Sequence, residues 1–156
     1  MTPDQLKDTL RMAKLCAKRI LSLLEQERQA LAGRDSVVIE QLVTAKLQAF
    51  ERWEQLESQR RGLLQKSGLA NDNRGMEQFL ARADHSGELN RAWRELQDLT
   101  ARCRQENQLN GNIIDIHRRQ ASEALAILSG QLGRLTGYAA SGNAQRSSEN
   151  RLLGEA

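Results

Sequence analysis

Residues 2–33 read TPDQLKDTLRMAKLCAKRILSLLEQERQALAG, and this stretch decides the fold class. It opens with Thr2 and Gln5, which can cap each other's backbone around a proline at the first helical position. Apolar residues then recur at alternating steps of four and three, the spacing of a helix packed along one seam. The stretch predicts a helix over about residues 3–32, with Gly33 as a natural stop. The seam residues are Leu6, Leu10, Ala13, Ala17, Ile20, Leu24 and Leu31.

Two further long helices are expected. The link after Gly33 is short, so helices over 3–32 and 36–66 should form an antiparallel hairpin. The last helix should cover residues 87–135. The expected seam of the second helix contains Val38, Leu42, Ala45, Ala49, Leu56 and Leu63, interrupted by Arg52 and Gln59. The expected seam of the last helix runs through Leu89, Trp93, Leu96, Thr100, Cys103, Asn107, Asn110, Ile114, His117, Ala121, Ala124 and Leu128.

Turn-forming residues separate these helices. Residues 67–75 and the break before residue 87 are rich in Gly, Asn, Asp and Ser, which leaves room for a short helix over 76–83. Beyond residue 137 the chain is polar and rich in small residues, as in disordered segments. We therefore expect an all-α, elongated antiparallel three-helix bundle over 1–137, with one short extra helix and a flexible tail over 138–156.

Composition restricts the function. Aromatic residues make up 3% of the chain and there is one proline, which argues against a β-rich fold. The net charge is +3, but basic and acidic residues alternate without a basic block, so only the isoelectric point near 9.2 favours nucleic-acid binding. Two distant cysteines and the lack of an apolar signal core or a membrane-length apolar run predict a reduced, cytoplasmic protein.

No pattern of catalytic or metal-binding residues stands out. His85 and His117 have no Cys, Asp or Glu at metal-ligand spacing, and His117 fits a hydrogen-bonded core position. Cys16 and Cys103 lie on or beside apolar faces, where a buried thiol is more typical than a nucleophile. No glycine-rich phosphate loop occurs. We therefore expect no enzyme activity, no metal and no cofactor.

Four polar residues fall near the helix seams. Glu25 and Glu27 are neighbours on the first helix, and without a cleft they suit a solvated or helix-pairing role better than acid–base chemistry. Asn107 and Asn110 interrupt the last seam. Buried amides at such positions fix helix register, and the alternative is a polar break that marks where bundle packing ends.

Helix length indicates a binding surface. At 1.5 Å per residue the first two helices are each about 45 Å long, and the last is about 75 Å. The last helix should therefore extend beyond the first two helices from near His117. Its apolar face should also be broadened by Ile113, Ile116 and Ile127. An exposed apolar patch of this kind usually binds a partner. The alternatives are self-association and coverage by the short helix.

Four short stretches of the sequence, in this order, resemble those of a known family. They are LLE at 23–25 with Ala30, Leu31 and Asp35; Leu42-x-x-x-Lys46; NQLNGNII at 107–114; and GYAASG at 137–142. Their order and spacing resemble those of the FlgN-type flagellar export chaperones over about residues 6–142. The family's usual glycine after the tyrosine is here Ala139, so the last stretch is a looser match.

The resemblance implies a cytoplasmic chaperone that holds the C-terminal segments of hook-filament junction proteins, FlgK and FlgL, and delivers them to the export gate. In this family the client surface is attributed to the end of the last helix, here 121–135, and the following tyrosine, here Tyr138, to docking on the gate's cytoplasmic domain. Tyr138 could instead pack on the bundle end. We call the expected client-binding residues the apolar stripe: Ile113, Ile116, Ala121, Ala124, Leu125, Ile127, Leu128, Leu132 and Leu135.

Overall fold

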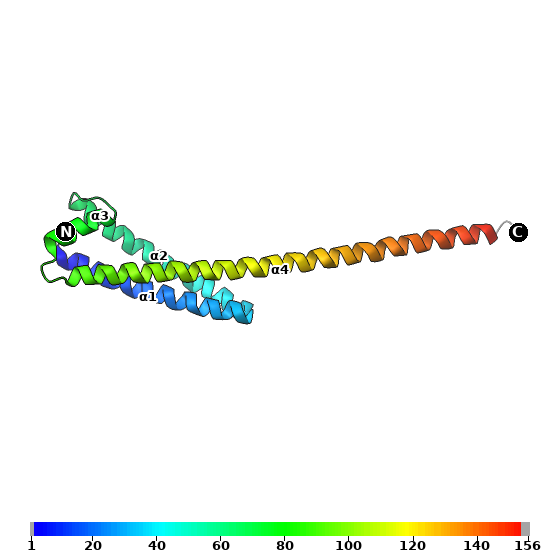
Figure 1. Ribbon diagram of the computed structural model, residues 1–156, viewed down its shortest axis with the longest axis horizontal. Coiled ribbons are helices and arrows are strands. Elements are labelled where there is room, and N and C mark those ends of the chain that lie inside the picture. Colours follow the sequence, from blue (N-terminus) through cyan, green and yellow to red (C-terminus); the bar gives the residue numbers. More distant parts are fainter. Residues whose placement is uncertain (1, 154–156) are drawn as a thin grey trace. The chain divides into compact units, whose positions relative to one another are not determined.

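The computed structural model describes the backbone of residues 2–153 and the side chains of residues 2–131, 133, 134, 136 and 137. Within this part no strand occurs, and the prediction of an all-α fold is confirmed. The helices, labelled in Figure 1, are α1 (Pro3–Gly33), α2 (Ser36–Lys66), α3 (Asn73–Ala83) and α4 (Glu88–Leu153).

The chain divides into two compact units. The N-terminal unit, Met1–Ile113, contains α1, α2, α3 and the first part of α4, and the C-terminal unit, Ile114–Ala156, contains the rest of α4. The helical bundle and its core belong to the N-terminal unit, because the buried residues extend no further than Asn110.

The N-terminus of α1 is capped as predicted. The Gln5 amide donates to the Thr2 hydroxyl at 3.3 Å, and the Thr2 amide donates to the Gln5 side chain at 3.1 Å. At the other end, the left-handed residue is Arg34 (φ 53°) rather than the expected Gly33. The helix runs on through Gly33, and the Arg34 amide closes the last turn on the carbonyls of Ala30 and Leu31.

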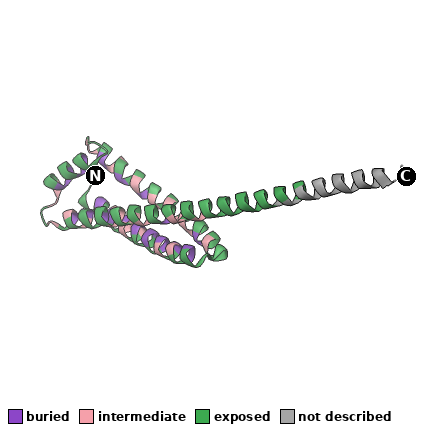
Figure 2. Ribbon diagram, turned by 45° about the vertical axis from the view of Figure 1, so that its right-hand side comes forward, coloured by how far each residue is buried: buried purple, intermediate pink, exposed green. Residues whose placement is uncertain are grey.

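The α1 seam is buried throughout, as predicted. Its seven residues, from Leu6 to Leu31, are each less than a tenth exposed. In Figure 2 buried positions recur along one side of α1. Because burying one leucine side chain contributes about 1.5–3 kcal/mol, the leucines of this seam are a substantial part of the apolar core.

The seam expected for α2 is confirmed in part: Leu42 and Leu56 are buried, and Ala45 and Ala49 are half-buried. The predicted seam included Val38 and Leu63, but Val38 is exposed and Leu63 is only partly buried. An α-helix drifts about 20° per heptad away from a strict seven-residue repeat. Near the end of α2 the buried residues are therefore Arg60 and Leu64, at steps of four after Leu56, rather than Leu63.

The short helix α3 begins at Asn73, three residues before its expected start. It begins there because the Asp72 carboxylate accepts a hydrogen bond from the Gly75 amide at 2.9 Å. Phe79 and Leu80 are buried, as expected, and Met76 is buried beside them. All three belong to the core cluster that also contains seam residues of α1 and α4.

Helices α1 and α4 run parallel in the N-terminal unit. Lys7 pairs with Glu88, and Asn110 bonds the Leu24 carbonyl, so later positions on one helix meet later positions on the other. Helix α2 runs antiparallel to α1, since Lys46 pairs with Glu27 while the later Ala49 meets the earlier Cys16. This arrangement confirms the predicted three-helix bundle.

Helix α4 is longer than expected. It continues to Leu153, whereas the sequence indicated an end at 135 because of Gly130, Gly133 and Gly137. Each of these glycines costs about 1 kcal/mol of helix propensity relative to alanine, but none removes a backbone donor as proline would. The flexible tail expected at 138–156 stays a prediction, because its side chains and residues 154–156 lie outside the described part.

Candidate partner-binding surface

The helices are aligned by a buried polar network on α1. Glu27 is 2% exposed, and its carboxylate accepts hydrogen bonds from the Lys46 ammonium at 2.7 and 2.9 Å. The Asn110 side-chain amide donates to Glu27 Oε2 at 2.7 Å and to the Leu24 carbonyl at 2.9 Å. Glu27 thus joins α2 and α4 to one turn of α1.

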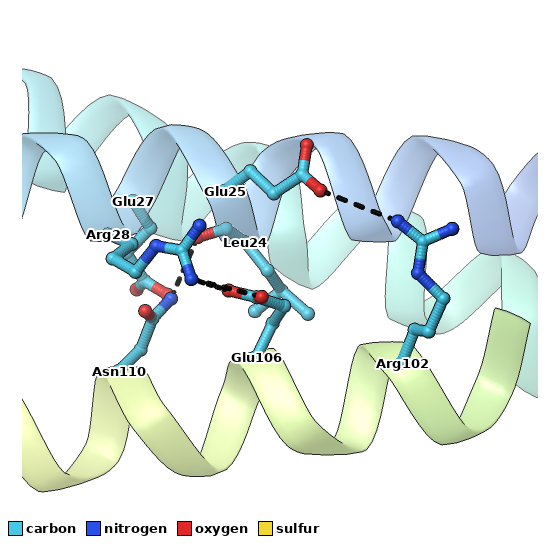
Figure 3. A network of polar contacts seen from close by, with 7 residues as sticks. All are labelled: Leu24, Glu25, Glu27, Arg28, Arg102, Glu106 and Asn110. Atoms are coloured by element: carbon cyan, nitrogen blue, oxygen red, sulfur yellow. Dashed lines mark hydrogen bonds and ion pairs between the residues drawn. The ribbon is translucent and has the colours of Figure 1, made fainter.

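Further ion pairs line the same contact between α1 and α4. Figure 3 shows Arg28 reaching Glu106, at 2.8–3.0 Å, and Glu25 facing Arg102 at 4.0 Å. Of the two roles expected for these carboxylates, helix pairing holds for Glu27, whereas the Glu25 side chain is 45% exposed and reaches Arg102 only at 4.0 Å. Lys46 stood out in the sequence only through the spacing Leu42-x-x-x-Lys46, and its pairing with Glu27 was not predicted because the two residues are 19 positions apart.

The two asparagines of the expected seam differ. Asn110 is 1% exposed and holds the register between α1 and α4, as one of the two interpretations predicted. Asn107 is exposed, so its placement among the buried seam residues was wrong. The reason is again the drift of a straight helix away from a seven-residue repeat.

The two thiols are packed rather than reactive. Cys16 Sγ donates to the Ala49 carbonyl at 3.3 Å, and Cys103 Sγ donates to the Ala17 carbonyl at 3.4 Å. Both residues are half-buried, and burial raises the pKa of each thiol above its ordinary value. A raised pKa lowers the fraction of nucleophilic thiolate at neutral pH, which fits structural thiols.

Histidine and carboxylate side chains form no metal centre among the described residues. His85 is exposed, and His117, expected in the core, is only half-buried. Across the same residues, no helix combines the length and hydropathy needed to cross a membrane.

The apolar stripe is exposed over most of its described part. Every residue from Arg118 to Gln131 is exposed, including the large side chains Leu125 (64%), Ile127 (62%) and Leu128 (54%). Figure 2 shows this part of α4 in the colour of exposed residues. Ile116, Ala121 and Ala124 are exposed too, and Ile113 is half-buried.

Three predicted site residues lie outside the side chains that the structure describes: Leu132, Leu135 and Tyr138. Over the described part, helical geometry at about 100° per residue places Ala121, Leu125 and Leu128 on one side of α4. Ile116 and Ile127, expected to broaden this face, lie more than about 120° around the helix from its centre and so face another side. The stripe therefore offers aliphatic side chains and no group with catalytic chemistry.

Comparison with known proteins identifies the family. The family model named FlgN protein matches residues 1–146. A crystal structure from Pseudomonas aeruginosa that carries the name of a flagella synthesis protein, FlgN, superposes with a TM-score of 0.66 at 30% sequence identity, covering 73% of this chain and 88% of that one. None of the curated proteins matches this sequence. Since the family model spans nearly the whole chain, the protein belongs to the FlgN family.

Proposed function

We propose that this protein is a cytoplasmic flagellar type III export chaperone, which binds the C-terminal segments of the hook-filament junction proteins FlgK and FlgL and delivers them to the export gate. As a member of the FlgN family it is a flagellar assembly protein. The observation that carries the finer proposal is the exposed apolar stripe on α4.

The stripe suits a client that is unfolded before export. A disordered segment must bury apolar surface to offset the entropy lost when it becomes ordered. Leu125, Ile127 and Leu128 supply such surface on a preformed helix, so the chaperone side has little ordering cost. Holding a client in this way is an equilibrium process that requires no catalytic residue or cofactor.

The client surface can be tested with a double substitution, Leu125→Asp with Leu128→Asp. Titration calorimetry with a C-terminal FlgK or FlgL peptide should show binding weakened by at least about tenfold, because two aliphatic contacts are replaced by charges. Both side chains are exposed, so circular dichroism should show an unchanged fold. Leu47→Asp is the matched control, since Leu47 is equally exposed but lies on α2. Unchanged peptide binding by the double variant would refute the assignment.

Docking on the export gate is proposed for Tyr138. The substitution Tyr138→Ala should abolish pull-down of the gate's cytoplasmic domain while client binding stays intact. Loss of thermal stability without loss of gate binding would instead favour the packing alternative, in which the ring covers the bundle end.

A self-associating structural coiled coil is the second candidate. The same exposed side chains of α4 favour it, because Ala121, Ala124 and Leu128 follow coiled-coil spacing. Light scattering distinguishes the candidates. A chaperone monomer should keep its mass across dilution, whereas a tight dimer that dissociates in the Leu125→Asp, Leu128→Asp variant would support the coiled coil.

A further inference from the structure

A second surface lies in the N-terminal unit, apart from the apolar stripe. A cleft of about 1020 Å³ is bordered by α2, the turn before α3, and α4. The chain's two tryptophans, Trp53 and Trp93, both line it. A smaller pocket of about 220 Å³ shares Trp53, Thr100 and Arg104 with the cleft and is lined by aliphatic and aromatic side chains from α1 and α2. The two hollows thus offer a polar part and an apolar part that share one wall.

Some of the charged side chains that line the cleft have a partner, and others have none among the described residues. Of its three carboxylates, Glu57 binds Arg60, Asp72 accepts a hydrogen bond from the α3 backbone, and Glu54 forms no ion pair with a described residue. Three arginines that line the cleft form no ion pair with any residue that the structure describes: Arg61, Arg74 and Arg104. The cleft therefore carries a local excess of unpaired positive charge.

Arg60 adds a buried donor without an acceptor. Its side chain is 7% exposed, and its guanidinium lies 5.1 Å from the centre of the Trp93 ring. Nε and Nη2 bind Glu57 at 3.2 and 2.9 Å, whereas Nη1 has no hydrogen-bond partner. Buried polar groups in proteins are almost always hydrogen-bonded, so this N–H, in a residue that lines the cleft, is a buried donor that lacks an acceptor.

We propose that this cleft binds an acidic peptide segment of a partner protein. A carboxylate of the segment is held by Arg104 and Arg60, and a neighbouring apolar side chain enters the smaller pocket. The planar guanidinium matches a carboxylate with two parallel hydrogen bonds, which favours this ligand chemistry. A nucleic acid would require free aromatic faces for base stacking, but Trp93 is only 7% exposed and Arg60 lies over its ring.

Tryptophan fluorescence reports on this cleft directly, because both tryptophans line it. The probe is a blocked amphipathic helical peptide with glutamates on one face and leucines on the other, titrated into the full chain. We expect a saturable fluorescence change that weakens with added salt. A counterpart peptide with glutamine in place of each glutamate should bind at least about tenfold more weakly, because it lacks the charge-assisted hydrogen bonds.

The variant Arg104→Gln tests whether this arginine binds the acidic peptide. It is suitable because Arg104 is exposed, so its replacement leaves the core intact. Binding of the acidic peptide should weaken by about tenfold. Arg94→Gln, at an exposed position of the same helix outside the cleft, should bind like the unaltered chain. The Leu125→Asp, Leu128→Asp variant should also bind normally, so failure here is distinct from failure of the chaperone proposal.

Three results would overturn the inference. The first is equal affinity for the glutamate and glutamine peptides. The second is unchanged binding by Arg104→Gln. The third is a saturable response to a single-stranded oligothymidylate with none to the acidic peptide, which would assign the cleft to nucleic acid.

Discussion

Asn110 shows how one side chain can fix the alignment of helices. It lies on α4 but bonds two groups on α1, the Leu24 carbonyl and the Glu27 carboxylate. Glu27 also binds Lys46 of α2. The three long helices therefore meet at a single buried carboxylate, which an apolar contact of similar size could not position as specifically.

We expect Asn110→Ala to lower the free energy of unfolding by about 1–3 kcal/mol, because it removes a buried hydrogen bond to the Leu24 carbonyl and another to Glu27 Oε2, which then keeps only Lys46. Urea denaturation measures this loss. Asn107→Ala is the matched control, since Asn107 is exposed on the same helix and should change stability by less than about 0.5 kcal/mol. Equal effects at the two positions would contradict the role assigned to Asn110.

Asp84 links stability to pH. Burial opposes ionisation, but hydrogen bonds from the amides of Asn90, Leu89 and Gly87 and from the Ser86 hydroxyl prevail and lower the pKa of Asp84 below 3.8. When the pKa of a carboxyl is lower in the folded state than in the unfolded state, its ionisation stabilises the fold at pH values above the unfolded-state pKa. This stability is lost as the pH falls through the folded-state pKa. The stability gap between the protein and Asp84→Asn should therefore shrink as pH falls below 3.8. Denaturation at successive pH values measures it, and a gap independent of pH would refute the linkage.

At the scale of the element, α4 combines two kinds of surface on one helix. Its first turns bury Leu89, Trp93 and Leu96 in the core, whereas residues 118–131 are exposed throughout. A helix without tertiary contacts depends on propensity and length for its stability. The glycines in the exposed part should therefore weaken it locally.

The pair Gly130→Ala with Gly133→Ala should stabilise this part of α4, because each substitution removes about 1 kcal/mol of propensity cost. A β-carbon at either position meets no atom within 4 Å. Slower amide hydrogen exchange around both positions would be the expected result. The control is Gly75→Ala, which should instead destabilise the fold, since its β-carbon would lie 1.9 Å from the Ala70 carbonyl oxygen. Unchanged exchange would mean that glycine does not limit this helix.

At the scale of the molecule, folding and the proposed client binding belong to different units. The buried residues lie at or before Asn110, within Met1–Ile113. The exposed part of the apolar stripe follows in Ile114–Ala156. A change in the client surface should therefore leave the core intact.

A fragment of residues 1–113 should fold on its own. Its unfolding free energy should lie within about 1 kcal/mol of the full chain, because it keeps the whole buried core. It should also lose binding to the FlgK or FlgL peptide. Urea denaturation and calorimetry test the two statements separately, and an unfolded fragment would show that the later part of α4 contributes to the core.

The sequence alone determined the formation of the four helices of the described chain, the α1 seam and the N-terminal capping of α1, because these depend on residues within a few positions of one another. It also indicated the apolar stripe through its periodicity. Only the tertiary structure decided that α2 ends with Arg60 and Leu64 buried rather than Leu63, which of Asn107 and Asn110 is internal, and that Arg60 lies against Trp93. These features depend on contacts between residues up to 86 positions apart, such as Asn110 with Leu24, and no local pattern encodes such a distance.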